Sequence, residues 1–210
     1  MKVDEILTEN NIKARNVIGS AIRVDEIPDK YRDQYKLIGR GATSLVYEYD
    51  DDNVLVFTRD KMKEEWIRIA LQMSQYIDEF EVRGVSTIRG MSEIPIMVFK
   101  MTKLYPLSPE NKRKVIKEID QFHLIRNKFI ARGKRDYNHD LVNYYNEHHP
   151  DSILIDVLDW FGNYDIKQFH FDFMPRNFMQ TKKGEIIPVD PVVDREVYDL
   201  IMSHRERKYG

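Results

Sequence analysis

The pattern of apolar and polar positions divides the chain into a strand-rich first half and a helix-rich second half. In the first half, short runs rich in β-branched and aromatic residues are separated by Gly, Pro, Asp and Asn, which is typical of strands joined by turns. The predicted strands are a pair around a glycine turn in 35–49 and single strands at 54–58, 80–85 and 94–99. Asp60 is the predicted N-cap of a helix that runs to about Ile77 and interrupts the strands.

In the second half, apolar residues recur at three- and four-residue spacing and predict helices. Ser108 followed by Pro109 is a strong helix start, because Ser caps the N-terminus and Pro fits the first helical position. This helix is expected to continue until Gly133. Further helices are predicted after the capping residue Ser152 and at 195–204.

These elements predict an α+β fold in two parts, an antiparallel-sheet lobe followed by a mainly helical lobe. Residues 35–103 form the first predicted lobe and residues 104–210 form the second. Residues 1–34 mix charged and apolar positions without a clear period, so they are expected to form an N-terminal extension.

The densest group of chemically useful residues surrounds a predicted β-hairpin at 178–189. Two short apolar segments flank a Lys-Lys-Gly turn, which is typical of a hairpin. The pattern His-x-Asp-x-x-x-x-Asn precedes it and another Asp follows it, so Asp172, Asn177 and Asp190 are expected to converge. Two carboxylates and a carboxamide suit Mg²⁺, which prefers oxygen ligands and keeps several waters.

A second pattern, Gly39-x-Gly41, lies in the turn between the first two predicted strands. Glycines allow backbone N–H groups to approach phosphates closely, so a turn of this kind can cover a nucleotide. A Gly-x-Gly hairpin on its own is more commonly a plain turn. Its position upstream of the Asp172 motif makes nucleotide binding the favoured interpretation.

Composition limits the other functional classes. The 210 residues are 42% apolar and 32% charged, which is enough for a globular core. A formal net charge of −2 gives no electrostatic argument for nucleic-acid binding. The chain has no cysteine, which excludes disulfides and thiolate zinc sites. No apolar leader or membrane-length run is found, so we expect a cytoplasmic protein without membrane contact.

Together the two motifs resemble the glycine-rich loop and the catalytic loop of the protein-kinase superfamily. In the kinase pattern Gly-x-Gly-x-x-Gly-x-Val, Ser44 stands at the third glycine and Val46 at the valine. The pair Asp190-Pro191 is similar to that of the small protein-kinase-like proteins that bacteriophages express early in infection. The resemblance covers roughly residues 35–194 and implies a two-lobed protein-kinase-like fold with a truncated second lobe.

The resemblance implies a role for each residue of the second-lobe motif. Asp172 accepts or orients the proton of the acceptor hydroxyl, while Asn177 and Asp190 hold Mg²⁺ against the phosphates of ATP. His170 supports the loop by packing and hydrogen bonding. Asp194 is a weaker candidate for a position near the metal.

In the first lobe, the resemblance implies nucleotide binding. Gly39 and Gly41 cover the phosphates, and Val46 packs against adenine. Met101 lies in the predicted hinge between the lobes, where backbone groups bond to adenine.

Two positions depart from the kinase pattern, and both concern positive charge. Kinases carry a Lys on the third strand that holds the α- and β-phosphates, but Val56 stands at that position, and Arg59 is the predicted substitute. Met174 stands where Ser/Thr kinases carry a Lys for the γ-phosphate. Arg176 is either a substitute cation from the same loop or the partner of a structural carboxylate.

The function that the resemblance implies is ATP- and Mg²⁺-dependent phosphoryl transfer to Ser or Thr of host proteins, in the cytoplasm of an infected bacterium. The absent strand Lys and the absent C-terminal docking helices favour an alternative, a pseudokinase that inhibits or recruits a host protein. A small-molecule kinase of the aminoglycoside or choline type is a third interpretation, because its catalytic loop has a similar pattern.

Overall fold

The computed structural model describes residues 22–81, 88, 90–131, 138–162, 164 and 168–209. The fold belongs to the α+β class, as predicted. The chain forms two compact units, of which the first combines Met1–Lys103 with Glu196–Gly210 and the second is Leu104–Arg195. Residues 196–210, which the sequence places in the second lobe, therefore belong to the first unit.

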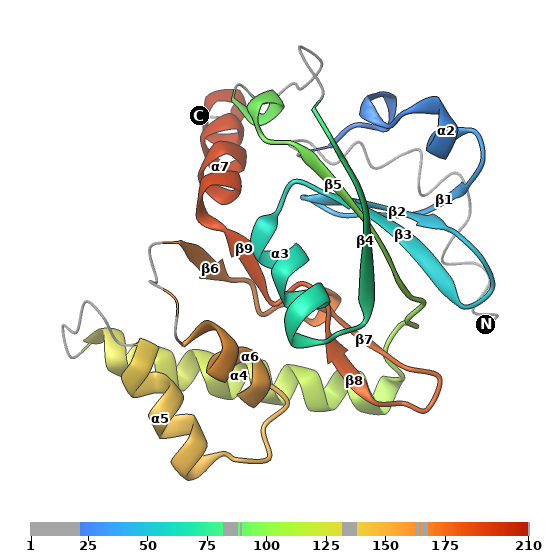
Figure 1. Cartoon of the computed structure of the whole chain (residues 1–210). Coiled ribbons are helices and arrows are strands. Elements are labelled where there is room, and N and C mark those ends of the chain that lie inside the picture. Colours follow the sequence, from blue (N-terminus) through green and yellow to red (C-terminus); the bar gives the residue numbers. More distant parts are fainter. Residues whose placement is uncertain are drawn as a thin grey trace. The chain divides into compact units, whose positions relative to one another are not determined.

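The first unit is built on an antiparallel sheet with the strand order β1-β2-β3-β5-β4 (Figure 1). The glycine turn joins β1 to β2, and β1 and β4 are the edge strands. The strands are β1 (Lys36–Arg40), β2 (Ser44–Glu48), β3 (Asn53–Thr58), β4 (Ser74–Phe80) and β5 (Ile96–Thr102).

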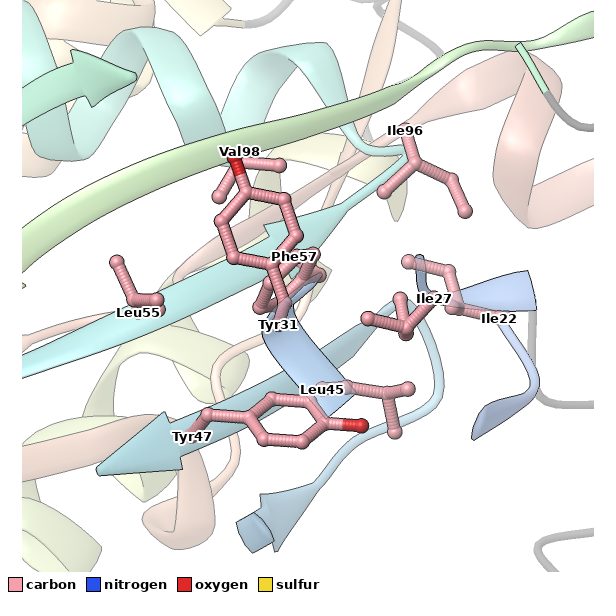
Figure 2. Packing of buried hydrophobic residues seen from close by; sticks show 9 residues of the cluster. All are labelled: Ile22, Ile27, Tyr31, Leu45, Tyr47, Leu55, Phe57, Ile96 and Val98. Carbon is pink, nitrogen blue, oxygen red and sulfur yellow. The ribbon is translucent and has the colours of Figure 1, made fainter. Parts of the chain in front are cut away.

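Of the predicted extension 1–34, residues 22–34 pack on one face of this sheet and contribute to its core, while residues 1–21 lie outside the described residues. The segment forms two short turns, η2 (Val24–Glu26) and α2 (Asp29–Arg32), which is why its apolar residues show no single period. Figure 2 shows Ile22 and Tyr31 among the apolar side chains of the strands. Because side chains alternate along a strand, the strand residues of this core share one face. They are Leu45, Tyr47, Leu55, Phe57, Ile96 and Val98.

Polar contacts fasten the same segment to the edge strand β4. Lys30 Nζ and Tyr31 Oη each donate a hydrogen bond of 2.9 Å to Asp78 Oδ2. The bond from Lys30, followed by that from Tyr31, lowers the pKa of the Asp78 carboxyl. The stability that these bonds contribute is therefore present above the pKa of an unfolded aspartate, and it is lost as the pH falls through the lower pKa of the folded state.

The helix after β3 is shorter than predicted. Asp60 is its N-cap, as expected, because its carboxylate accepts a backbone N–H three residues later at 3.2 Å. The helix consists of α3 (Lys61–Glu65) and a wider π turn, η3 (Trp66–Ala70), and does not reach Ile77. Ser74 already begins β4, which pairs with β5. The ladder with β5 outweighs the helical spacing of this stretch, so the predicted end of the helix is wrong.

Strands β4 and β5 also begin at residues other than those predicted. β4 ends at Phe80, where the predicted strand 80–85 begins, and residues 82–87 lie outside the described residues. β5 begins at Ile96 and not at residue 94. Pro95 precedes it, and a proline cannot donate to a strand ladder, so pairing starts after it.

The C-terminal helix α7 (Arg195–Tyr209) is longer than the predicted 195–204. Val197 and Ile201 are both buried and lie one turn apart. The neighbouring Leu200 approaches Gly90 so closely that a Cβ on Gly90 would lie 3.3 Å from Leu200 Cδ2. Gly90 also has a φ of +87°, a conformation that side-chain-bearing residues rarely adopt, so glycine is required here.

In its described residues, the second unit combines helices with two short antiparallel ladders (Figure 1). One ladder pairs β6 with β9 and the other pairs β7 with β8 as a hairpin, as predicted. Helix α5 was not predicted from the sequence. The elements are α4 (Pro109–Ala131), α5 (Asn138–His148), α6 (Ile155–Phe161), β6 (Phe169–Phe171), β7 (Phe178–Gln180), β8 (Ile186–Pro188) and β9 (Val192–Asp194).

The start of α4 is fixed by a cap and by the hairpin. Ser108 Oγ accepts a hydrogen bond from Asn111 N at 3.2 Å, which confirms the predicted N-cap. Asn111 Nδ2 donates to Gln180 Oε1 and to Gly184 O, at 2.8 Å each. These bonds hold the β7–β8 hairpin against the first turn of α4.

Aromatic side chains form the core of the second unit around β6. Phe173 meets Phe122 of α4 edge to face, with ring centroids 4.6 Å apart. Phe171 lies 5.1 Å from both Phe169 and Phe173, and Phe161 lies 5.2 Å from Phe169. Aromatic pairs of this kind add roughly 0.5–1.5 kcal/mol each beyond the burial of their area. The row of rings therefore restrains the backbone from 169 to 173.

Gly162, at the end of α6, allows α5 to approach closely. A Cβ at this position would lie 2.6 Å from Val142 Cγ2 and 2.8 Å from Leu158 O. We expect Gly162→Ala to lower the free energy of unfolding by about 2 kcal/mol, because such overpacking forces the backbone to shift. Urea unfolding followed by circular dichroism measures this loss.

The double variant Gly162→Ala/Val142→Ala separates the two clashes. Removing the valine methyls relieves one of them, so we expect it to be less destabilised than the sum of the single variants. An unchanged midpoint for Gly162→Ala would contradict the close approach of α5 to α6.

Candidate functional site

Alternation along β6 positions the first candidate residues. In the run Phe-His-Phe-Asp-Phe, neighbouring side chains point to opposite sides, so His170 and Asp172 lie away from the side of the aromatic core. Phe169 and Phe173 are buried, at 1% and 2% exposure. Asp172 N donates to Pro191 O at 2.9 Å, which places Asp172 beside the start of β9.

The loop after Asp172 folds back on that residue. Met174 N donates to Asp172 O at 2.9 Å, and the turn η5 (Pro175–Asn177) is closed by Asn177 N donating to Met174 O at 2.8 Å. The side chain of Asn177 then completes the loop, since its Nδ2 donates to Asp172 O at 2.6 Å and to Asp172 Oδ2 at 2.9 Å.

The backbone carbonyl of Asn177 connects this loop to Asp190. It accepts hydrogen bonds from Val189 N at 2.8 Å and from Asp190 N at 3.3 Å. The β7–β8 hairpin starts at the residue after Asn177 and returns the chain to it. The structure therefore brings Asp172, Asn177 and Asp190 together at the open end of the hairpin.

The chemistry of these three side chains fits a hard cation. Asn177 is 6% exposed. Its side chain donates two hydrogen bonds to Asp172, both from Nδ2, and Oδ1 takes part in neither of them. Mg²⁺ accepts carboxylate and carboxamide oxygens together with water. Among the described residues, no group of three or more His, Asp or Glu side chains is placed to hold a metal. The oxygens here that could hold a metal are Asn177 Oδ1 and the Asp190 carboxylate, while Asp172 is held by Asn177 Nδ2.

Met174 and Arg176 are the exposed side chains of the loop. Met174 is 41% exposed although it is apolar. Within the part of the chain that the structure describes, the Arg176 guanidinium makes no ion pair with a carboxylate. Of the two predicted roles for Arg176, the pairing with a structural carboxylate is therefore not found.

His170 and Asp194 lie in the β6–β9 ladder. His170 is opposite Val193, and Asp194 is opposite Phe169, at the end of the ladder away from Asp172. About 10 Å of extended strand separates Asp194 from Pro191, which is the residue that bonds Asp172. Asp194 is therefore not part of the group around Asn177.

In the first unit, Gly39, Val46 and Val56 lie side by side across β1, β2 and β3. A Cβ on Gly39 would lie 3.4 Å from Val46 Cβ. Because side chains alternate, these residues occupy the sheet face opposite the core residues Leu45 and Phe57. Val56, at the position of the expected Lys, is 2% exposed and supplies no charge to this face.

Buried hydroxyl groups hold the glycine turn, and sequence reasoning missed them. Ser44 Oγ donates to Thr58 Oγ1 at 3.5 Å, and Thr58 Oγ1 donates to Thr43 O at 3.0 Å. Thr58 Oγ1 also accepts from Asp60 N at 3.1 Å, next to the start of α3. The turn is thus tied to the end of β3. Its only sequence signal is the polar pair Thr43-Ser44 beside two glycines.

The geometry of Arg59 argues against the phosphate role that the sequence predicts. Its side chain is fully buried, and Nη2 lies 3.0 Å from Oε1 of Glu26, which is also fully buried. Nη1 donates to Met91 O at 2.7 Å and to the carbonyl of Ile94. Burial lowers the pKa of Arg59 while Glu26 opposes this, and an arginine stays charged. Arg59 therefore links the N-terminal segment to the turn before β5.

Met101 lies inside the sheet. It is opposite Val54 of β3 and Ser74 of β4 and is 6% exposed. The chain leaves the sheet only after Thr102, and Lys103 N donates to Asp52 O at 2.8 Å. The residue predicted to lie in a hinge is therefore part of a strand that is paired on both sides.

Comparisons of the chain with protein-family models, with curated proteins and with solved structures found no match. No helix in the described part of the chain has the length and apolar character needed to cross a membrane.

Proposed function

We propose that the protein is an ATP- and Mg²⁺-dependent phosphotransferase of the protein-kinase type, acting on Ser or Thr hydroxyls of another protein. The observation that carries this proposal is the closed loop in which Asn177 bonds Asp172 through its side chain and Asp190 through its carbonyl. Phosphoryl transfer of this type needs one carboxylate at the acceptor hydroxyl, and a carboxylate with a carboxamide at the metal. The resemblance to phage kinases makes proteins of an infected bacterium the proposed substrates.

The three residues have separate tasks in this proposal. Asp172 accepts or orients the proton of the acceptor hydroxyl, and the bond from Asn177 Nδ2 fixes its carboxylate. Asn177 Oδ1 and the Asp190 carboxylate hold Mg²⁺, and bound Mg²⁺ would neutralise charge on the phosphates. The aromatic row behind β6 keeps Asp172 in place while the substrate binds.

Arg176 is the cation of the proposed site. It is exposed, makes no ion pair with a described carboxylate, and stands one residue before Asn177. A guanidinium remains charged and forms two parallel hydrogen bonds to a phosphate. In this proposal Arg176 supplies the positive charge that Met174, at the position of the γ-phosphate Lys, does not carry.

Incubation of the purified protein with labelled ATP, Mg²⁺ or Mn²⁺, and bacterial lysate tests the proposal. We expect label on Ser or Thr of the protein itself or of lysate proteins, in a form that survives acid. Absence of label with both metals would contradict the proposal.

A second candidate function is a pseudokinase that acts by binding alone. Val56 at the position of the phosphate Lys, and the commitment of Arg59 to Glu26, favour it. A thermal-shift titration distinguishes the two functions. Stabilisation by ATP that requires Mg²⁺ favours the phosphotransferase, and the absence of any shift favours the binder.

Replacement of Gly41 by Ala tests the glycine turn without disturbing the fold. A Cβ at Gly41 would meet only Ser44 backbone atoms, the nearest being Ser44 O at an ordinary 3.7 Å, and Gly41 is not in the left-handed region. We expect the free energy of unfolding to change by less than about 0.5 kcal/mol. The affinity for MgATP should fall about tenfold, because the methyl group keeps phosphates from the backbone of the turn. Calorimetric titration measures the affinity.

Gly184→Ala is the matched control. Gly184 has a φ of +87°, and nothing lies within 4 Å of the position that a Cβ would take, so the change adds backbone strain but no clash. We expect a loss of roughly 1 kcal/mol in stability and no change in MgATP affinity. Equal affinities for wild type and Gly41→Ala would exclude the turn as a phosphate site.

A further inference from the structure

Met174 is a large apolar side chain that the loop after Asp172 leaves in water. It is 41% exposed, whereas its neighbour Phe173 is 2% exposed and packs on Phe122 in the core. The other large apolar side chains that are exposed among the described residues belong to the first unit or to α4. Within the described part of the chain, Met174 is therefore the residue of this kind that lies beside the proposed site.

The backbone of Met174 is fixed relative to Asp172. Its N–H donates to Asp172 O at 2.9 Å, and its carbonyl accepts from Asn177 N at 2.8 Å. Pro175 follows, and a residue before proline is confined to the extended region, in agreement with a φ of −121° and a ψ of 144° at Met174. Both backbone polar groups are bonded, so the exposed side chain extends from a rigid base.

Met174 and Asp172 lie on the same side of the chain, away from the aromatic core. The rings of Phe171 and Phe173 both contact Phe122, with centroids 5.6 Å and 4.6 Å from it. Side chains alternate along an extended chain, so Asp172, between these two rings, and Met174, after them, face the other side. The exposure of Met174 agrees with this direction.

We propose that Met174 selects acceptor sites in which an apolar residue stands next to the Ser or Thr that is phosphorylated. This inference rests on the proposed function, in which Asp172 holds the acceptor hydroxyl. The neighbour of the acceptor residue lies one Cα step of about 3.8 Å along the substrate, within reach of a long side chain beside Asp172. Contact with Met174 removes apolar surface of both side chains from water, which stabilises the bound substrate.

The chemistry of the Met174 side chain determines the class of neighbour that it accepts. A thioether carries no charge and is only a weak hydrogen-bond acceptor, so a Glu or Lys of the substrate would lose water there without gaining a partner. Methionine is unbranched and adapts to apolar groups of different shape. The selected neighbour is therefore apolar in general and is not restricted to one residue type.

The test measures acceptor preference with short peptides. Each peptide consists of Gly, Gln and Ala around a central position that is an equal mixture of Ser and Thr, and both neighbours of that position are Leu, Met, Ala, Glu or Lys. With the full chain, labelled ATP and Mg²⁺, initial rates at low peptide concentration give relative values of kcat/KM. We expect the Leu and Met peptides to be labelled about fivefold faster than the Ala peptide, and the Glu and Lys peptides no faster than it.

Substitution of Met174 should change this preference. Met174→Ala is expected to reduce the ratio of the Leu rate to the Ala rate to below about twofold, and Met174→Leu to retain the wild-type ratio. Met174→Glu should make the Lys peptide the best substrate, because a carboxylate at this position attracts its ammonium group. The Met174 side chain is exposed and makes no capping hydrogen bond, so these changes should leave the fold intact. Leu124→Ala shortens another exposed apolar side chain of the second unit and is the matched control, which should keep the wild-type ratio.

Four results would overturn the proposal while the phosphotransferase stands. The first is label on lysate proteins or on the protein itself, with no label on the peptides or no preference among them. The second is an unchanged ratio in Met174→Ala, and the third is an equal fall of the ratio in Leu124→Ala. The fourth is a Met174→Ala protein that labels neither peptide, because Met174 would then be required for the reaction itself.

Failure of the proposed function gives a different result, which is absence of label on lysate proteins, peptides and the protein itself. The inference about Met174 is then wrong as well, because it needs an acceptor hydroxyl at Asp172. A ratio that falls in Met174→Ala, turns to the Lys peptide in Met174→Glu and is unchanged in Leu124→Ala supports the proposal.

Discussion

Asp172→Asn is expected to lower the rate of phosphoryl transfer by about 10²–10⁴-fold while leaving MgATP affinity close to that of the wild type. A residue that handles the proton of the acceptor contributes on this scale. The substitution preserves shape, and an asparagine oxygen can still accept the hydrogen bond that Asn177 Nδ2 donates at 2.9 Å. The loop should therefore remain closed, so the loss should appear in kcat and not in binding.

Asp190→Asn should give the complementary result. Its backbone N–H still bonds Asn177 O, but a metal ligand loses its charge. We expect the concentration of Mg²⁺ needed for half-maximal activity to rise. Asp194→Asn is the control, because Asp194 lies at the far end of the β6–β9 ladder. If Asp172→Asn keeps more than about a tenth of the wild-type rate, Asp172 is not the proton-handling residue.

Arg59→Met is expected to lower the free energy of unfolding by about 3–5 kcal/mol. The change leaves the Glu26 carboxylate fully buried without its partner, and removing one member of a buried ion pair has this cost. It also removes the hydrogen bonds to Met91 O and Ile94 O. Chemical unfolding followed by tryptophan fluorescence measures the loss.

Two further variants define the cause of this effect. The double variant Glu26→Gln/Arg59→Met carries no buried charge at this position, so it should recover a substantial part of the lost stability. Arg68→Met breaks the pair with Glu64, in which the arginine is 42% exposed, and should cost less than about 1 kcal/mol. If Arg59→Met instead weakens MgATP binding and leaves stability unchanged, the phosphate role predicted from the sequence is correct.

The local part of the site could be predicted from the sequence because it depends on neighbouring residues. The alternation of side chains in Phe-His-Phe-Asp-Phe predicts the direction of Asp172, and the hairpin between Asn177 and Asp190 predicts that these two residues meet. These two local patterns are enough to bring Asp172 and Asp190 to Asn177. Ser108 indicated the start of α4 for the same reason, since a cap acts over one turn. In each case the deciding contacts lie within about twenty residues of one another.

The features that were missed depend on contacts between distant parts of the chain. Arg59 has the appearance of a solvated strand-end arginine, and only the fold brings Glu26 to it. Residues 74–77 continue the apolar spacing of the preceding helix. They nevertheless form a strand, because they pair with β5, which lies some twenty residues later in the sequence. The apolar residues of 22–35 show no helical or strand period because their positions are set by the apolar face of the sheet against which they pack.

The first unit is assembled from two distant stretches of the chain, and this affects how it folds during synthesis on the ribosome. Domains usually fold in the order in which they are translated. Residues 196–210 belong to the first unit, whose other residues are synthesised much earlier. The first unit therefore cannot complete its fold until residues 196–210 have left the ribosome. The second unit is continuous in sequence, and it is therefore the part that can complete its fold first during translation.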